Sequence, residues 1–103
     1  MARQPESREV RKILAYLRGK GGRWVKIHGG DNPFQEVGVP DILGCYRGRA
    51  IAIEAKTPAG HLSVKQKLFL KEWGEAGGYS LVATSLASVK SFIEGIDKEV
   101  DDQ

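Results

Sequence analysis

Two apolar, strand-like segments stand on either side of the dipeptide Arg47-Gly48, and this spacing constrains the fold more than any other feature of the sequence. The segments are Ile42–Tyr46 and Arg49–Ala55. Because only two residues separate them, we expect an antiparallel hairpin with a tight two-residue turn. The turn sets the pairing register of the whole hairpin. In that register Asp41 lies directly opposite Glu54, at the open end of the hairpin.

The two carboxylates of this pair would lie on one face of the sheet, with Cβ atoms about 4.5 to 5.5 Å apart. Like charges at that distance repel unless a positive charge lies between them. A divalent cation meets this need, and carboxylate oxygens are ligands that suit Mg²⁺ or Mn²⁺. Strand alternation places Lys56 on the same side as Glu54. A cation that polarises a phosphoryl oxygen, beside an ammonium group, is typical of phosphodiester hydrolysis. In the alternative interpretation Asp41 is a turn residue, and Glu54 and Lys56 form an ordinary exposed strand edge.

The rest of the chain alternates helical and strand-like patterns. We expect a helix over Ser7–Leu17 with Pro5 in its first turn, a strand over Arg23–His28, a loop over Gly29–Pro40, a helix capped by Ser63 and ended by Gly77-Gly78, a strand over Tyr79–Thr84, and a helix from Ser85 to about Ile96. The acidic tail over residues 97–103 is expected to fray. The order helix-strand-strand-strand-helix-strand-helix predicts one α/β domain, residues 1–103, with a mixed sheet flanked by helices.

Composition excludes several classes of protein. The chain has 103 residues and a single cysteine, Cys45, which rules out an internal disulfide and a Cys-rich zinc site. Cys45 lies on an apolar strand and is expected to be buried and inert. The sequence has no run of about 18 apolar residues and no signal-peptide pattern, which favours a soluble cytoplasmic protein without a membrane partner.

The positive charge is concentrated in the first half of the chain. Residues 1–50 hold ten Lys or Arg against five Asp or Glu, whereas the remainder holds six against eight. A basic half favours a polyanionic partner such as nucleic acid, although basic helices are often only solvated faces. The candidate phosphate-binding residues are Arg8, Arg11, Lys12, Lys26 and His28.

Three short motifs carry a family resemblance. They are Gly38-Val39-Pro40-Asp41, then Ile53-Glu54-Ala55-Lys56, then Leu62-Ser63 with Gln66 and Phe69-Leu70. In order and spacing they resemble the virus-type replication-repair nuclease (VRR-NUC) domain of the PD-(D/E)XK nuclease superfamily, over roughly residues 6 to 93. The resemblance implies a restriction-endonuclease-like αβββαβ core and an Mg²⁺- or Mn²⁺-dependent DNA endonuclease. It also implies that Asp41, Glu54 and the Ala55 carbonyl bind metal, that Lys56 is catalytic, and that Gln66 is an accessory active-site residue.

The family also places a glutamate of the first helix at the site, and two residues compete for this role here. On a helical wheel Glu6 lies nearer than Glu9 to the apolar stripe, so Glu6 is the preferred candidate. Either residue could instead be a first-turn acid favoured by the helix dipole.

Standalone domains of this family are expected to act as homodimers on branched DNA such as four-way junctions. The alternatives are a flap or end-directed nuclease, which would serve DNA replication or repair beside other proteins, and an inactive nuclease fold that binds nucleic acid without cutting it. An RNA substrate also stays open.

Overall fold

The computed structural model describes residues 5–27 and 36–103, with side chains from residue 8 onward. Its elements are α1 (Pro5–Lys20), β1 (Arg23–Lys26), β2 (Ile42–Tyr46), β3 (Arg49–Ala55), α2 (Val64–Glu75), β4 (Tyr79–Ala83) and α3 (Leu86–Asp101). The predicted order of helices and strands is confirmed. None of the helices formed by the described residues combines the length and the apolar content that a membrane-spanning helix needs.

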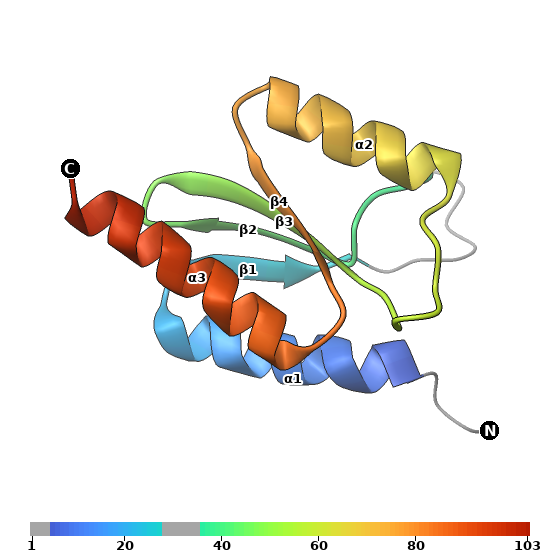
Figure 1. Cartoon of the computed structure of the whole chain (residues 1–103), viewed down its shortest axis with the longest axis horizontal. Coiled ribbons are helices and arrows are strands. Elements are labelled where there is room, and N and C mark those ends of the chain that lie inside the picture. The colour runs from blue at the N-terminus through green and yellow to red at the C-terminus, as the bar shows by residue number, and fades with distance from the viewer. Residues whose placement is uncertain (1–4, 28–35) are drawn as a thin grey trace.

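The four strands form one mixed sheet in the order β1-β2-β3-β4. β1 pairs with β2 and β2 with β3 in antiparallel fashion, whereas β3 and β4 are parallel. Parallel neighbours require a crossover connection, and here that connection contains α2. Figure 1 shows α2 on one face of the sheet and α1 with α3 on the other. The chain is therefore a three-layer α/β domain, as predicted.

The hydrophobic core lies between the sheet and the pair α1 and α3. The apolar stripe of α1 meets the inward side chains of the strands and of α3, in a cluster of Val10, Ile13, Leu14, Leu17, Trp24, Ile42, Tyr46, Ile51, Ile53, Ala55, Ala83, Val89, Ile93 and Ile96. The opposite face is only partly covered, because α2 has no buried residue. The prediction that Cys45 is buried was wrong. Its side chain points to this open face and is exposed, because α2 packs against β4 and leaves β2 uncovered.

The predicted register of the central hairpin is confirmed. Tyr46 pairs with Arg49 and Ile42 pairs with Ile53. The turn residues Arg47 and Gly48 have φ values of 49° and 83°, the left-handed geometry of a type I′ turn. The twist of this turn matches that of the strands, so the register holds along the whole of β2.

The C-terminal helix is longer than the sequence predicts. We expected it to end near Ile96, with a frayed acidic tail, but α3 continues to Asp101. The reason is a set of contacts between this acidic turn and residues far away in the sequence. Asp97 accepts a hydrogen bond of 2.6 Å from the Tyr46 hydroxyl and pairs with Lys20 and Arg47, while Arg47 also pairs with Asp101.

These contacts should make stability depend on pH in a defined way. The hydrogen bond from Tyr46, followed by those from Arg47 and Lys20, holds the pKa of Asp97 at about 2, below the ordinary 3.8. Because the pKa is lower in the folded state, the stabilisation is complete above the unfolded pKa and is lost as the pH falls toward 2. We expect Asp97 to contribute about 1 kcal/mol at pH 6, after allowance for solvent screening.

Urea unfolding of the wild type and of Asp97→Asn at pH 6 and pH 2.5 measures this contribution. The amide still accepts from Tyr46 but does not titrate, so the difference in stability between the two proteins should be clearly smaller at pH 2.5 than at pH 6. Equal differences at both pH values would contradict the role given to Asp97.

Candidate active site

Asp41 occupies the position beyond the last ladder pair between β2 and β3. Its backbone carbonyl accepts a hydrogen bond of 2.8 Å from the Ile27 N–H, which ties it to the end of β1. Its side-chain Oδ2 accepts a second hydrogen bond, also 2.8 Å, from the Ala55 N–H of β3. The carboxylate therefore lies against the end of β3, beside Glu54, as the hairpin register predicts.

Pro40 explains why a side chain, rather than the backbone, meets Ala55. If the register of the hairpin is continued by two residues, Pro40 stands opposite Ala55. Pro40 has no N–H, so it cannot donate to the Ala55 carbonyl, which points to the same side of β3 as the Ala55 N–H. Asp41 takes the N–H of Ala55, and the Ala55 carbonyl faces a residue without a donor. The Ala55 carbonyl therefore lies on the Asp41 side of β3, where the register gives it no backbone donor from Pro40.

Glu54 is the buried charged residue of the described part of the chain, with 3% of its surface exposed. Strand alternation turns it away from the core residues Ile53 and Ala55 and toward α2. There the Gln66 side chain donates a hydrogen bond of 3.3 Å from Nε2 to Glu54 Oε2. A buried carboxylate needs such donors, because its desolvation is otherwise costly. The structure thus brings Gln66 to Glu54, as the resemblance implied.

A tight contact fastens the segment before Asp41 to α2. Gly38 has a φ of 90°, and a Cβ built on it would lie 2.7 Å from the carbonyl carbon and oxygen of Lys65. Only glycine allows both this backbone conformation and this approach. The first turn of α2 therefore holds both sides of the site, Asp41 through the chain from Gly38 and Glu54 through Gln66.

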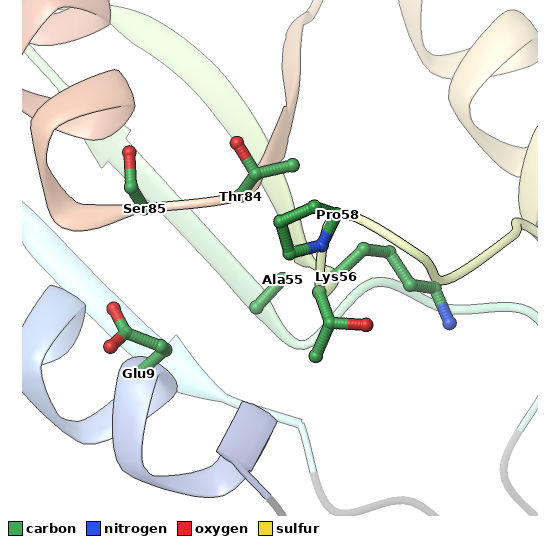
Figure 2. A pocket seen from close by; sticks show the side chains of 7 residues that line it. Glu9, Ala55, Lys56, Pro58, Thr84 and Ser85 are labelled. Carbon is green, nitrogen blue, oxygen red and sulfur yellow. The ribbon is translucent and has the colours of Figure 1, made fainter.

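Lys56 directly follows β3 and is partly buried. Figure 2 shows its side chain extending away from Glu9 and Ser85, toward the side of the sheet on which α2 lies. The sequence-predicted alignment of Lys56 with Glu54 is consistent with this orientation.

Glu9 lies on the other side of the end of β3. It lines a cavity of about 240 Å³ together with Ala55, Lys56, Thr57, Pro58, Thr84 and Ser85, and it also pairs with Lys12 at 3.7 Å. The preferred helix-one candidate, Glu6, has its side chain outside the described residues, as does His28. Glu6 therefore stays a prediction, and Glu9 is the helix-one acid that the described side chains place near β3.

The donor set suits a hard cation with an open coordination sphere. Within the described residues no three His, Cys, Asp or Glu side chains converge as a metal cluster. For a cation held here, Asp41 and Glu54 would supply two carboxylates, and the Ala55 carbonyl would supply a third oxygen. Mg²⁺ commonly binds through one or two carboxylates and completes its octahedron with water and substrate phosphate oxygens. The residues present are compatible with that kind of site.

Two groups of basic residues are candidates for phosphate binding, and they lie on opposite sides of the sheet. Arg8, Arg11 and Lys12 are exposed on α1, and Lys26 alternates with Val25 so that it points to the α1 side. These four basic residues therefore lie on the opposite side of the sheet from Gln66 and Glu54. A second group, missed when charge was counted by halves of the chain, lies on α2, the helix that carries Gln66, and comprises the exposed residues Lys65, Lys67 and Lys71. The signal was visible, since residues 64–71 contain three lysines and no acid.

A comparison with solved structures places the fold among known ones. The chain superposes on a structure described as a VRR_NUC domain with a TM-score of 0.72 and 22% sequence identity, covering 86% of this chain and 94% of that chain. A scan against protein-family models finds no match, and neither does a search of curated proteins. The fold expected from the sequence motifs is thereby confirmed.

The contact between Gly38 and α2 can be tested with a matched pair of variants. Gly38→Ala should destabilise the protein by about 2 to 4 kcal/mol, because it combines a positive φ with a clash against the backbone of Lys65. Gly74 lies within α2, and a Cβ built on it would have no atom within 4 Å. Gly74→Ala should therefore stabilise the protein by up to about 1 kcal/mol. Urea unfolding measures both. Equal effects of the two substitutions would show that Gly38 does not seat the loop on α2.

Proposed function

We propose that this chain is a metal-dependent deoxyribonuclease that hydrolyses phosphodiester bonds with water as the nucleophile. The observation that carries the proposal is the end of β3, where Asp41 is bonded to the Ala55 N–H next to a buried Glu54 held by Gln66. Two carboxylates, a backbone oxygen and an ammonium group on one strand end match the needs of phosphoryl chemistry. The fold shared with a VRR_NUC domain structure supports the same conclusion.

Each residue has a defined task in this proposal. Asp41, Glu54 and the Ala55 carbonyl hold Mg²⁺ or Mn²⁺, which when bound polarises an oxygen of the scissile phosphate. Lys56 orients the attacking water or stabilises the negative charge that develops on the phosphate. Gln66 keeps the Glu54 carboxylate in place. The water oxygen forms the new bond to phosphorus, and the bond from phosphorus to the leaving sugar oxygen breaks without a covalent enzyme intermediate. A helix-one glutamate, Glu6 in the first instance, would assist at the same site.

Replacing a single proposed catalytic residue, Asp41 or Lys56, should strongly slow cleavage without unfolding the protein. In Asp41→Asn the amide oxygen can still accept from the Ala55 N–H, so the fold is retained while a negative ligand is lost. We expect the cleavage rate of Asp41→Asn and of Lys56→Ala to fall by about 100-fold or more in Mg²⁺ or Mn²⁺. Lys98→Ala, a charge removal on α3, should stay within twofold of the wild type.

The assay uses linear, flapped and four-way-junction DNA, with and without EDTA, and thermal unfolding verifies each variant. Full activity in both Asp41→Asn and Lys56→Ala would sink the assignment. Binding of DNA without cleavage in any divalent metal would instead favour an inactive binding module of the same fold.

The DNA backbone is bound, in this proposal, by basic residues of both groups. Lys65, Lys67 and Lys71 lie on α2, the helix that carries Gln66, and in this proposal they meet phosphates near the cut. The more distant phosphates are contacted by the α1-side residues Arg8, Arg11, Lys12 and Lys26, joined by His28. Phosphate contacts by Lys and Arg make affinity fall with salt, by about 0.9 in the logarithmic slope per contact.

Fluorescence anisotropy of labelled DNA with the Asp41→Asn protein can separate the two groups. The triple substitution of Lys65, Lys67 and Lys71 by alanine should lower the salt slope by about 2 to 3. The matching alanine substitutions at Arg8, Arg11 and Lys12 should lower it less. Unchanged slopes in both proteins would contradict a phosphate-binding role for either group.

We further propose that the domain acts as a homodimer on branched DNA. Three apolar side chains are exposed around the first turns of α2, namely Val37 at 71%, Val64 at 81% and Leu68 at 47%. Val64 and Leu68 are one helical turn apart, and Val37 precedes the Gly38 that packs on Lys65. A two-fold pairing through this apolar patch would bring two cutting sites to one junction.

The expected result is a dimer by light scattering and paired cuts on opposing strands of a four-way junction. Leu68→Asp should give a folded monomer, because α2 has no buried residue whose packing the charge would disturb. A wild-type protein that stays monomeric on DNA, or that cuts a single strand only, would argue for a flap or end-directed nuclease instead.

A further inference from the structure

The helix α2 begins with a capping box that also reaches the proposed metal site. The Ser63 hydroxyl oxygen accepts from the Gln66 N–H at 3.1 Å, and the Gln66 side-chain Oε1 accepts from the Ser63 N–H at 2.8 Å. The same Gln66 amide donates through Nε2 to Glu54. One side chain therefore joins the helix cap to the buried carboxylate.

The cap determines which way the Gln66 amide is turned. An amide group has one accepting oxygen and one donating nitrogen. Because the Ser63 N–H requires an acceptor, Oε1 must face the cap, and Nε2 is left to face Glu54. A reversed amide would place two donors together at the cap and two oxygens together at Glu54. Both ends of Gln66 thus agree on a single orientation.

The second capping box of the chain lacks this link. At the start of α3, the Ser85 hydroxyl oxygen accepts from the Ser88 N–H at 3.2 Å. The Ser88 hydroxyl oxygen accepts from the Ser85 N–H, and the Ser88 O–H donates to the Ser85 carbonyl. Serine is too short to extend from its own cap to a further group in the way that Gln66 does. The two boxes have the same helix-capping chemistry, but only the α2 box touches a carboxylate of the site.

We infer that Ser63 is a positioning residue of the active site. It holds the first turn of α2, and through Gln66 it sets the orientation of the Glu54 carboxylate. The inference rests on the proposed function for its consequence in catalysis, while the hydrogen-bond chain itself belongs to the fold. The weak packing of α2 increases the importance of the cap, since no buried apolar side chain of this helix fixes its first turn.

The test compares Ser63→Ala, Ser63→Thr and Ser85→Ala. Loss of either cap should cost stability of a similar size, because the two boxes are alike. We expect Ser63→Ala to lower kcat by about fivefold, less than the roughly 10- to 100-fold usual when a direct partner of a metal ligand is removed, because Ser63 acts through Gln66. The KM for DNA should change by less than twofold. Ser63→Thr keeps a hydroxyl and should restore kcat, and Ser85→Ala, which removes the other cap, should lower kcat less than Ser63→Ala does.

A spectroscopic measurement makes the inference independent of activity. The side-chain amide signals of Gln66 in a ¹H–¹⁵N spectrum, identified by their absence in Gln66→Glu, should shift in Ser63→Ala and in Glu54→Gln but not in Ser85→Ala. If those signals and kcat do not change in Ser63→Ala while stability falls, Ser63 is only a helix cap and the inference is overturned. If the wild type cuts no DNA in any metal, the proposed function fails. The amide signals then decide alone whether Ser63 orients Gln66 against Glu54.

Discussion

The two-residue turn at Arg47-Gly48 is the constraint on which the site depends. It sets the register of β2 against β3, and each further pair along the hairpin follows from it. A shift of one residue would turn Glu54 into the apolar core and expose Ile53. The turn and the carboxylates lie at opposite ends of the hairpin. Arg47 of the turn forms ion pairs with Asp97 and Asp101. These pairs lie far from the carboxylates, but they stabilise the turn that sets the register of the carboxylates.

The two faces of the sheet have separate physical roles. The face toward α1 and α3 is packed with aliphatic and aromatic side chains and supplies most of the hydrophobic stabilisation. The face toward α2 is less tightly packed, because α2 has no buried residue, but it must still hold the buried carboxylate of Glu54. Because apolar packing on this face is sparse, the carboxylates are held instead by hydrogen bonds and by a close glycine contact. Gln66 meets Glu54, and Gly38 lies against Lys65. We therefore expect the position of α2 to depend more on its helix cap than the positions of the other helices do.

Local patterns in the sequence were enough to predict the elements, the hairpin register and the side of the sheet on which Glu54 lies. Each of these depends on neighbours in the chain, through period-two alternation and turn chemistry. The errors came from contacts between distant residues. Cys45 looked buried because its strand is apolar, yet no helix covers that part of the sheet. The last turn of α3 looked frayed because it is acidic, yet its partners Tyr46 and Arg47 lie about fifty residues earlier in the chain.

The arrangement of charge in space differs from its arrangement along the chain. The second half of the sequence is acidic as a whole, but four of its acids gather at the C-terminal end of α3, and three of its lysines lie on α2. The C-terminal end of α3, which lies near the hairpin turn in Figure 1, carries Asp97, Glu99, Asp101 and Asp102. The lysines of α2 are Lys65, Lys67 and Lys71. Most of the acids at the turn end are paired with Lys20, Arg47 and Arg49 of the same domain, so they repel a polyanion less than their number suggests. In the proposed function, the lysines of α2 would attract phosphates, while Asp41 and the buried Glu54 would hold a cation that offsets their own negative charge.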